Sequence, residues 1–227
     1  MTAEGVHTKS ALADKVREFL TQFKDPTGSF SYVERIDQMV VKQVTYIVVD
    51  FNDLVSVPVI EEKFRESADE ILVAFRDAIY EMLKERYPEY AEKNKHDIRA
   101  RIANFPDERS LRQINSDVIT KMISVSGMVV RASEVKPLAK EVTYKCLDKH
   151  ISQFTLLDGM SLNASVKCQT PNCKHTNLAI VPQESRFIDF QIVRLQELPE
   201  DLPPGHLPLY VNVSMKQDLV DYARPGD

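Results

Sequence analysis

Residues 146–150 read Cys-Leu-Asp-Lys-His, and residues 168–173 read Cys-Gln-Thr-Pro-Asn-Cys. These two stretches hold all three cysteines of the sequence, together with one histidine, and seventeen residues separate them. Two close pairs of soft ligands joined by a loop are typical of a chain that wraps a tetrahedral Zn²⁺ ion. The alternative is three unrelated free cysteines, but their clustering in one window favours metal. The spacing therefore predicts a zinc site formed by Cys146, His150, Cys168 and Cys173.

The sequence between the pairs predicts a small ribbon with metal at both ends. Residues 151–156 are suited to a strand, Asp158-Gly159 to a turn, and residues 162–166 to a returning strand. His175 is a rival fourth ligand, although His150 is preferred because it gives one pair at each end. A site filled by four protein ligands is structural rather than catalytic. It would stabilise the ribbon with the roughly 10–16 kcal/mol that structural Zn²⁺ supplies.

Charge is unevenly distributed along the 227 residues, whose formal net charge is −5. Residues 96–175 carry 12 Lys and Arg against 8 Asp and Glu, whereas the segments before and after are net acidic. A basic block of this kind can hold a phosphate backbone even within an acidic chain. No apolar run approaches the roughly 20 residues of a membrane span, so no membrane partner is expected. The odd cysteine count and the metal-like cluster favour a reducing compartment.

The first 95 residues have mainly helical periodicity. Helices are expected over residues 11–23 and 31–41, and one long amphipathic helix over residues 58–90, which Pro88 kinks or ends. Residues 45–51 are β-branched and aromatic and predict a strand. The apolar stripe of the long helix is interpreted as core, with no cofactor.

After a polar linker at residues 93–97 the pattern changes to short strands. Strands are expected at residues 98–104, 128–133, 187–195 and 209–215. Short strands interrupted by a zinc ribbon favour a small Greek-key barrel. The fold class is therefore α+β, with a helical bundle at residues 1–95, a barrel at 96–141 and 176–227, and an inserted ribbon at 142–175.

Several kinds of catalytic chemistry have no support in the sequence. It contains no G-x-x-x-x-G-K-[ST], G-x-S-x-G or H-E-x-x-H motif. Its pairs of adjacent carboxylates fall on expected solvated faces or in loops. No catalytic residue is therefore assigned, and the chain itself is not expected to be an enzyme.

Three segments resemble the OB-fold of the minichromosome maintenance (MCM) replicative helicases. They are residues 119–137 (Ile-Thr-Lys-Met-Ile-Ser-Val-Ser-Gly-Met-Val-Val-Arg-Ala-Ser-Glu-Val-Lys-Pro), 187–197 (Phe-Ile-Asp-Phe-Gln-Ile-Val-Arg-Leu-Gln-Glu) and 218–227 (Asp-Leu-Val-Asp-Tyr-Ala-Arg-Pro-Gly-Asp). Their order, the intervening zinc pairs and the helical first third agree with that family over nearly the whole chain. Without large insertions, the sequence resembles an archaeal member most, and the resemblance implies a cytoplasmic, nucleoid-associated protein.

Two features depart from the family pattern. The family often uses four cysteines for zinc, whereas His150 replaces one here, and the pairs are spaced x3 and x4 rather than x2. The sequence also ends where the family continues into the rest of a five-stranded barrel, a basic hairpin and an ATPase domain. The resemblance therefore implies an incomplete barrel, with ATP and Mg²⁺ bound only by a longer protein that is an ATP-dependent DNA helicase.

The resemblance also implies which residues bind DNA. Arg131 and Arg194 match paired basic positions on two barrel strands, and Lys136 is a weaker candidate. Arg194 lies within the alternating, largely apolar stretch at residues 187–195, where a charged side chain suggests a specific role. Arginine can bind phosphates bidentately. The alternative for Arg194 is a structural ion pair with an acidic loop, and for Lys136 simple solvation. Few barrel aromatics and no tryptophan favour salt-sensitive backbone contacts over base stacking.

In the family, a loop matching residues 214–227 contacts the ATPase domain of the neighbouring subunit and transmits its nucleotide state to the DNA-binding domains. The expected communication residues are Gln196, Glu197, Lys216, Asp218 and Asp221. The zinc ribbon is expected to support the contact between two rings in a double hexamer. Implied partners are single- and double-stranded DNA, other replication proteins, and further copies in a hexamer, double hexamer or filament.

Two other functions compete with a helicase module that binds DNA and assembles rings. One is a free-standing zinc-ribbon OB-fold protein that binds single-stranded DNA. A P-loop downstream in a longer reading frame would exclude that alternative. The other is a zinc hydrolase, which needs an open metal position and is disfavoured by four protein ligands.

Overall fold

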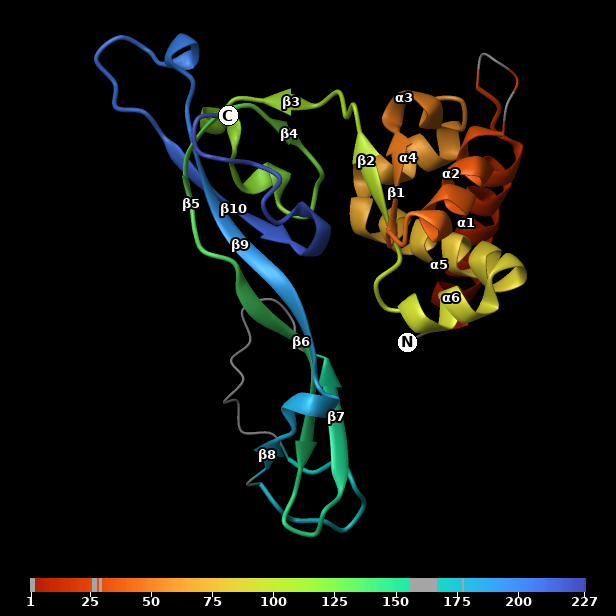
Figure 1. Ribbon diagram of the computed structural model, residues 1–227. Coiled ribbons are helices and arrows are strands. Elements are labelled where there is room, and N and C mark those ends of the chain that lie inside the picture. Colours follow the sequence, from red (N-terminus) through yellow and green to blue (C-terminus); the bar gives the residue numbers. More distant parts are fainter. Residues whose placement is uncertain (1–2, 26–27, 29, 156–166, 177) are drawn as a thin grey trace. The chain divides into compact units, whose positions relative to one another are not determined.

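The computed structural model describes residues 3–25, 28, 30–155, 167–176 and 178–227 (Figure 1). The chain divides into two compact units, residues 1–125 and residues 126–227. Among the described helices, none combines the length and the apolar character that crossing a bilayer requires.

The first unit is built mainly from helices around one apolar core. The helices are α1 (Ala3–Gln22), α2 (Ser31–Val41), α3 (Phe51–Leu54), α4 (Pro58–Glu66), α5 (Ala68–Arg86) and α6 (Pro88–Asn94). Aromatic rings join neighbouring elements: Phe51 packs edge-on against Phe64, with ring centroids 5.6 Å apart, and against Phe105 at 4.9 Å. The predicted helical bundle and the helices at residues 11–23 and 31–41 are confirmed.

The prediction of a single helix over residues 58–90 is wrong. The helical backbone is interrupted at Ser67, whose φ of −150° and ψ of 88° are not helical. It is interrupted again at Tyr87, directly before Pro88, which occupies the first turn of α6. Proline is disfavoured inside a helix but fits its first turn, so Pro88 ends α5 as expected. The break at Ser67 separates α4 from α5, and both helices contribute buried side chains to the same core.

A parallel pair of strands completes the first unit's core. β1 (Tyr46–Asp50) pairs with β2 (Arg99–Ala103), with Tyr46 opposite Arg99 and Asp50 opposite Ala103. Both strands were expected from their residue pattern, but their pairing was not. The unit also contains the short parallel pair β3 (Glu108–Arg109) and β4 (Ser124–Val125).

The second unit is an antiparallel OB-type sheet, which confirms the α+β class. Its central strand is β9 (Arg186–Gln196), which pairs with β5, β6 and β10. The remaining strands are β5 (Met128–Ala132), β6 (Lys136–Lys145), β7 (Ile151–Thr155), β8 (Ala179–Ile180) and β10 (Tyr210–Lys216). Gly127 lies directly before β5, where a Cβ would come 2.9 Å from the carbonyl oxygen of Gln196.

Long β6, which the sequence pattern did not predict, carries the zinc ribbon. Its first half pairs with β9, and its second half pairs with β7 and β8 (Figure 1). The ribbon's own core is small, with Val142 and Tyr144 buried and Phe154 packed edge-on against Tyr144 at 5.6 Å. The predicted strand at residues 151–156 is found as β7. The predicted turn at Asp158-Gly159 and returning strand at residues 162–166 lie outside the described residues.

Candidate zinc centre and nucleic-acid interface

The first ligand pair lies on a tight turn between β6 and β7. The amide of Lys149 donates to the carbonyl of Cys146 at 2.9 Å, and the amide of Cys146 donates to the carbonyl of His150 at 3.1 Å. Lys149 has a φ of 63°, which reverses the chain within this turn. These bonds direct the side chains of Cys146 and His150 to the same side.

The second pair lies on a similar turn. The amide of Cys173 donates to the carbonyl of Thr170 at 3.1 Å, and the amide of Cys168 donates to the carbonyl of His175 at 3.2 Å. Asn172 has a φ of 67°, and asparagine tolerates this left-handed region better than most residues. Both pairs therefore rest on turns closed by backbone hydrogen bonds.

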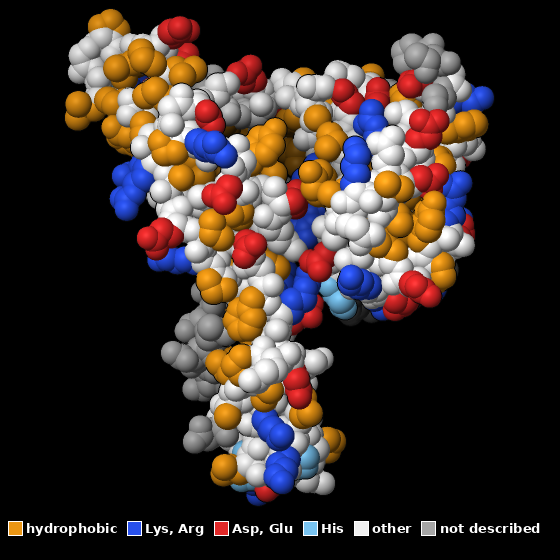
Figure 2. Space-filling model, viewed as in Figure 1, with side chains coloured by type: hydrophobic (Ala, Val, Ile, Leu, Met, Phe, Trp, Pro, Cys, Tyr) orange, Lys and Arg blue, Asp and Glu red, His pale blue; other side chains and the backbone are white. Residues whose placement is uncertain are grey.

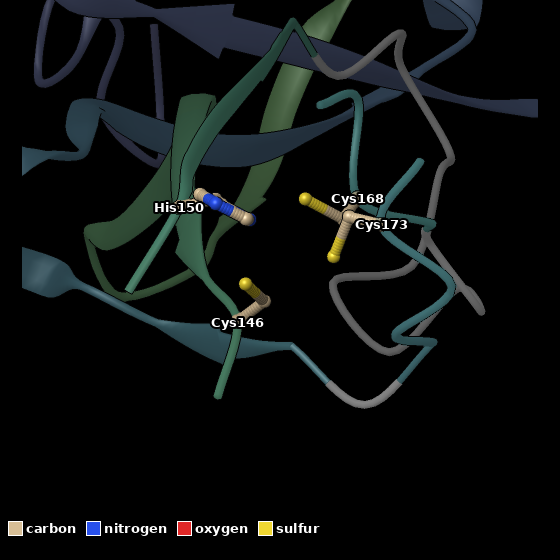
Figure 3. A group of neighbouring side chains, drawn as sticks. All are labelled: Cys146, His150, Cys168 and Cys173. Atoms are coloured by element: carbon tan, nitrogen blue, oxygen red, sulfur yellow. The ribbon is translucent and has the colours of Figure 1, made fainter. Parts of the chain in front are cut away.

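The two turns face each other and bring four ligand atoms together. One ligand atom from each of Cys146, His150, Cys168 and Cys173 lies within 4.8 Å of the others. Figure 3 shows the three thiols and the imidazole directed at a common centre. Among the described side chains, His150 Nδ1 is the buried polar atom that has no hydrogen-bond partner. A buried nitrogen without a partner is costly unless a ligand satisfies it, so this cluster fits a zinc site.

Neighbouring groups favour the thiolate that metal binding requires. Hydrogen bonds from the side chain and backbone of Thr170, helped by Ser152, lower the pKa of Cys168 to about 6. The Ser152 hydroxyl is buried, lies 3.8 Å from Cys168 Sγ and accepts a bond from the Gln169 amide. The backbone amide of His175 lowers the pKa of Cys173, but burial and the neighbouring thiols raise it overall. Sequence reasoning missed Ser152, because its proximity to Cys168 arises only from folding.

His175, the rival ligand, has a different partner. Its Nε2 lies 3.0 Å from Asp148 Oδ2, so this pair links the second turn to the first. Asp148, His175 and Cys173 also form a cluster of possible ligand atoms, which is more exposed than the Cys₃His cluster. Hydrogen bonds outside the ligand shell help to orient the ligands of a metal site, and this pair joins the two turns that carry them.

The two predicted DNA-binding arginines are direct neighbours in the sheet. Arg131 on β5 is the register partner of Arg194 on β9, and both are exposed. Asn212 on β10 is the partner of Arg194 on its other side. Within the described part of the chain neither arginine forms an ion pair, and Arg194 instead lies over the ring of Tyr210, 5.0 Å from its centroid.

A second basic row crosses the same sheet. Lys136 on β6 and Lys216 on β10 are both register partners of Phe190 on β9. Phe190 and Arg194 are four residues apart, so they share one face and lie roughly 14 Å apart along the strand. Lys136 and Lys216 therefore lie on the same sheet as Arg131 and Arg194. Lys216 was expected only in communication between subunits.

Sequence reasoning missed Tyr210 and Asn212 on this face. The signal was present, because residues 210–216 read Tyr-Val-Asn-Val-Ser-Met-Lys, in which every second residue faces the same way. Tyr210 is 48% exposed, which leaves its ring accessible beside Arg194.

The five expected communication residues lie at two ends of the β9–β10 pair rather than in one cluster. Gln196 is opposite Tyr210, whereas Lys216 is opposite Phe190, six residues further along, or about 20 Å. Asp218 and Asp221 follow Lys216 in the chain.

Glu197, at the first end, is almost fully buried. Its carboxylate accepts from the Leu209 amide at 3.1 Å, and its own amide donates to the Leu209 carbonyl at 3.0 Å. Glu197 therefore closes the base of the loop at residues 198–208. Figure 2 shows apolar side chains gathered over this projecting loop, where Leu207 and Leu209 are exposed.

At the second end, buried Gln191 joins three segments, and sequence reasoning missed it. Its Nε2 donates to the Ser133 carbonyl at 3.0 Å and to Asp221 Oδ1 at 3.2 Å. Its Oε1 accepts from the Asp221 amide at 3.0 Å. Gln191 thus fixes the C-terminal segment to the sheet.

Comparisons with known proteins agree with both the helical and the sheet unit. Residues 13–104 match the MCM N-terminal domain, and residues 110–227 match the MCM OB domain. The minichromosome maintenance protein MCM of Saccharolobus solfataricus is 30% identical over 215 residues, covering 92% of this chain and 31% of that protein. The DNA replication licensing factor MCM4 of Oryza sativa subsp. japonica is 36% identical over 160 residues, covering 70% of this chain and 18% of that protein.

These matches bear out the resemblance seen in the sequence. The MCM4 protein of Drosophila melanogaster is 35% identical over 158 residues, covering 70% of this chain and 18% of that protein. This chain therefore spans less than a third of the length of these relatives. With both domains matched in order over most of its length, the chain belongs to the minichromosome maintenance (MCM) family.

Proposed function

We propose that this chain is the N-terminal DNA-binding and ring-assembly module of a replicative helicase. The single observation that carries the DNA-binding part is the register pairing of Arg131 with Arg194. Like charges directly opposite each other in a sheet destabilise it, so a bound anion offers compensation. Two guanidinium groups side by side can each hold a phosphate bidentately, with two N–H groups donating to two of its oxygens.

The second basic row extends this phosphate-binding surface. Lys136 and Lys216 flank Phe190 and lie about 14 Å from the arginine row, so a single strand can run along β9 and meet both rows. Tyr210 offers a ring on which a base can stack, since every base has a π-face. Binding would be tolerant of sequence, because phosphate contacts carry no base information.

The zinc ribbon serves assembly in this proposal. Cys146, His150, Cys168 and Cys173 would hold a structural Zn²⁺, which supplies folding free energy to a ribbon whose own core is small. The exposed residues Leu147 and Ile151 lie on its first turn and the adjoining strand. Figure 2 shows basic and histidine side chains at the tip of the ribbon. Such a mixed surface suits a contact between copies in a hexamer, double hexamer or filament.

The two ends of the β9–β10 pair would communicate with other parts of a longer helicase. Gln196 and Glu197 support the apolar loop at residues 198–208, and Lys216, Asp218 and Asp221 belong to the opposite end. An ATPase domain that binds ATP and Mg²⁺ would contact these ends. The module would act in the cytoplasm at the nucleoid, with double-stranded DNA and other replication proteins as further partners. Residues 1–95, the barrel segments 96–141 and 176–227, and the ribbon 142–175 are proposed as its functional divisions, although β2, from the first of these barrel segments, packs in the core of the helical unit.

The test is binding of a labelled oligonucleotide, measured by fluorescence anisotropy across a salt series. Each phosphate contact to single-stranded DNA adds roughly 0.7 to the slope of log K against log salt. Arg131→Ala/Arg194→Ala should therefore lower that slope by about 1.4. Between 50 and 200 mM salt, wild-type binding should then weaken by about sevenfold more than binding by the double variant.

The matched control is Lys84→Ala/Lys93→Ala, which removes two exposed positive charges from the helical unit. It should leave the slope close to that of the wild-type chain. An equal loss of slope in both double variants would show that net charge rather than the arginine pair governs binding. If the Arg131→Ala/Arg194→Ala variant keeps the wild-type slope of log K against log salt, the paired arginines are excluded as the phosphate-binding site.

A further inference from the structure

The helical unit contains an acidic groove between α1, α4 and α5, far along the sequence from the residues assigned to DNA or zinc. Its volume is about 670 Å³. Ten of the described residues line it. Five of these are acidic and one is basic.

Two helices each present a regular stripe to this groove. On α4, Val59, Glu62 and Glu66 lie three or four residues apart, on a different face from the buried Ile60 and Phe64. Residues separated by three or four positions share one face of a helix. The groove face of α4 is therefore distinct from its core face.

The stripe on α5 has the same spacing. Asp69, Val73 and Asp77 follow one another at intervals of four, away from the buried Ile71 and Phe75. From Asp69 to Asp77 this stripe extends for about 12 Å, or roughly two helical turns.

Exposed apolar side chains stand between the acidic groups. Val59 is 47% exposed and Val73 is 39% exposed, and the partly buried Leu12 lies beside them. Burying a valine that water reaches favours association, because apolar surface is removed from water. A row of apolar residues flanked by charged residues is typical of a groove that binds an amphipathic helix.

The charge of the groove is only partly compensated within the unit. Lys63 lies 3.4 Å from Glu66 and 3.6 Å from Glu70, so it links α4 to α5. Asp77 pairs with Arg76. Glu62 on α4 and Asp69 on α5 have no ion-pair partner among the side chains that the structure describes. Each side of the groove therefore offers a carboxylate to a positively charged partner.

We propose that this groove docks a basic amphipathic helix of a partner protein. Two or three apolar side chains of that helix would cover Leu12, Val59 and Val73. Its lysines or arginines would form ion pairs with Glu62 on α4 and with Asp69 on α5. The negative lining repels nucleic acid, so this surface is separate from the proposed DNA-binding face.

The probe for the test is a designed, fluorescein-labelled helical peptide of about 14 residues, or roughly 21 Å. It carries leucines at helical positions i, i+4 and i+7, with lysines on both flanks. The full chain should bind this peptide, and increasing salt should weaken the binding. A peptide with glutamine in place of the lysines should bind at least about tenfold more weakly, and this comparison needs no change in the protein.

The groove variant is Glu62→Lys/Asp69→Lys, which should also weaken binding at least about tenfold. The matched control is Glu81→Lys/Glu89→Lys, which makes the same change in net charge at exposed positions outside the groove. It should change the affinity by less than about twofold. Circular dichroism of both variants checks that the helices are intact.

Three results would overturn the proposal. The first is an equal loss of peptide binding in both double variants, which would show that the net charge of the chain, rather than the groove, determines the affinity. The second is unchanged binding when serine replaces the peptide's leucines, which would exclude an apolar groove. The third is a loss of self-association of the chain in the groove variant alone, by light scattering, which would make a second copy the occupant. The groove variant is not expected to lose DNA binding, because added lysines do not weaken contacts to phosphates, so failure of this test and failure of the proposed function can be told apart.

Discussion

Replacing His150 by alanine removes one of the four donors that converge on the candidate zinc centre. Structural Zn²⁺ sites contribute roughly 10–16 kcal/mol, which shared over four ligands is about 2.5–4 kcal/mol for each. His150→Ala is therefore expected to weaken Zn²⁺ binding by about 10²- to 10³-fold. Nδ1 of His150 has no hydrogen-bond partner among the described groups, so it is the nitrogen expected to bind the metal.

The comparison variant is His175→Ala, which removes the rival histidine. Because His175 pairs with Asp148 and lies outside the Cys₃His cluster, its loss should act through the orientation of the two turns. Changes of that kind typically cost about 10- to 100-fold in metal affinity, at the lower end for an exposed pair. His150→Ala should therefore be the more damaging of the two substitutions.

The assay is competition for Zn²⁺ against a chromophoric chelator, with circular dichroism to check the fold. Substituted Co²⁺ gives an independent readout, because its visible spectrum reports tetrahedral thiolate coordination and should change in His150→Ala. A larger loss of affinity in His175→Ala than in His150→Ala would refute the assignment of His150 as the fourth ligand. Equal, negligible losses in both would refute a four-ligand site.

Three further changes test what stabilises each of the two units on its own. Gly127→Ala should destabilise the sheet by about 1–3 kcal/mol in urea denaturation, because the new Cβ would lie 2.9 Å from the Gln196 carbonyl; wild-type stability would show that β5 can move away. Gln191→Ala should cost about 1–3 kcal/mol by leaving its buried partners unpaired, and faster hydrogen exchange at the Asp221 amide would report the released segment; unchanged exchange would contradict this role. Phe64→Ala should cost about 3–5 kcal/mol in the helical unit, measured by the loss of helical circular dichroism in urea, whereas a cost below 1 kcal/mol would mean that the core refills the space.

Local patterns predicted much of the secondary structure. The alternation at residues 187–195 gave β9, the β-branched run at residues 45–51 gave β1, and the apolar spacing at residues 11–23 gave part of α1. These predictions succeed because periodicities of two and 3.6 follow from backbone geometry alone. The same argument failed at Ser67, since the helical spacing of apolar residues continues through a break that only packing against a common core imposes.

The zinc ligands were predictable for a similar reason. Close pairs of ligands are local in sequence, and each pair is held by one turn with its own backbone hydrogen bonds. The sequence left His150 and His175 open as alternatives, however. Folding is what brings the two turns face to face, places His150 in the four-membered cluster and pairs His175 with Asp148.

The sequence by itself determined the α+β class, the position of the ligand pairs and the presence of arginines in strands, because each depends on residues close together in the chain. Only the tertiary structure decided which residues meet across strands. It set Arg131 opposite Arg194, aligned Lys136 and Lys216 on either side of Phe190, and separated the two groups of communication residues. The physical reason is that strand register depends on contacts between distant segments, and a shift of one residue would turn every side chain to the other face.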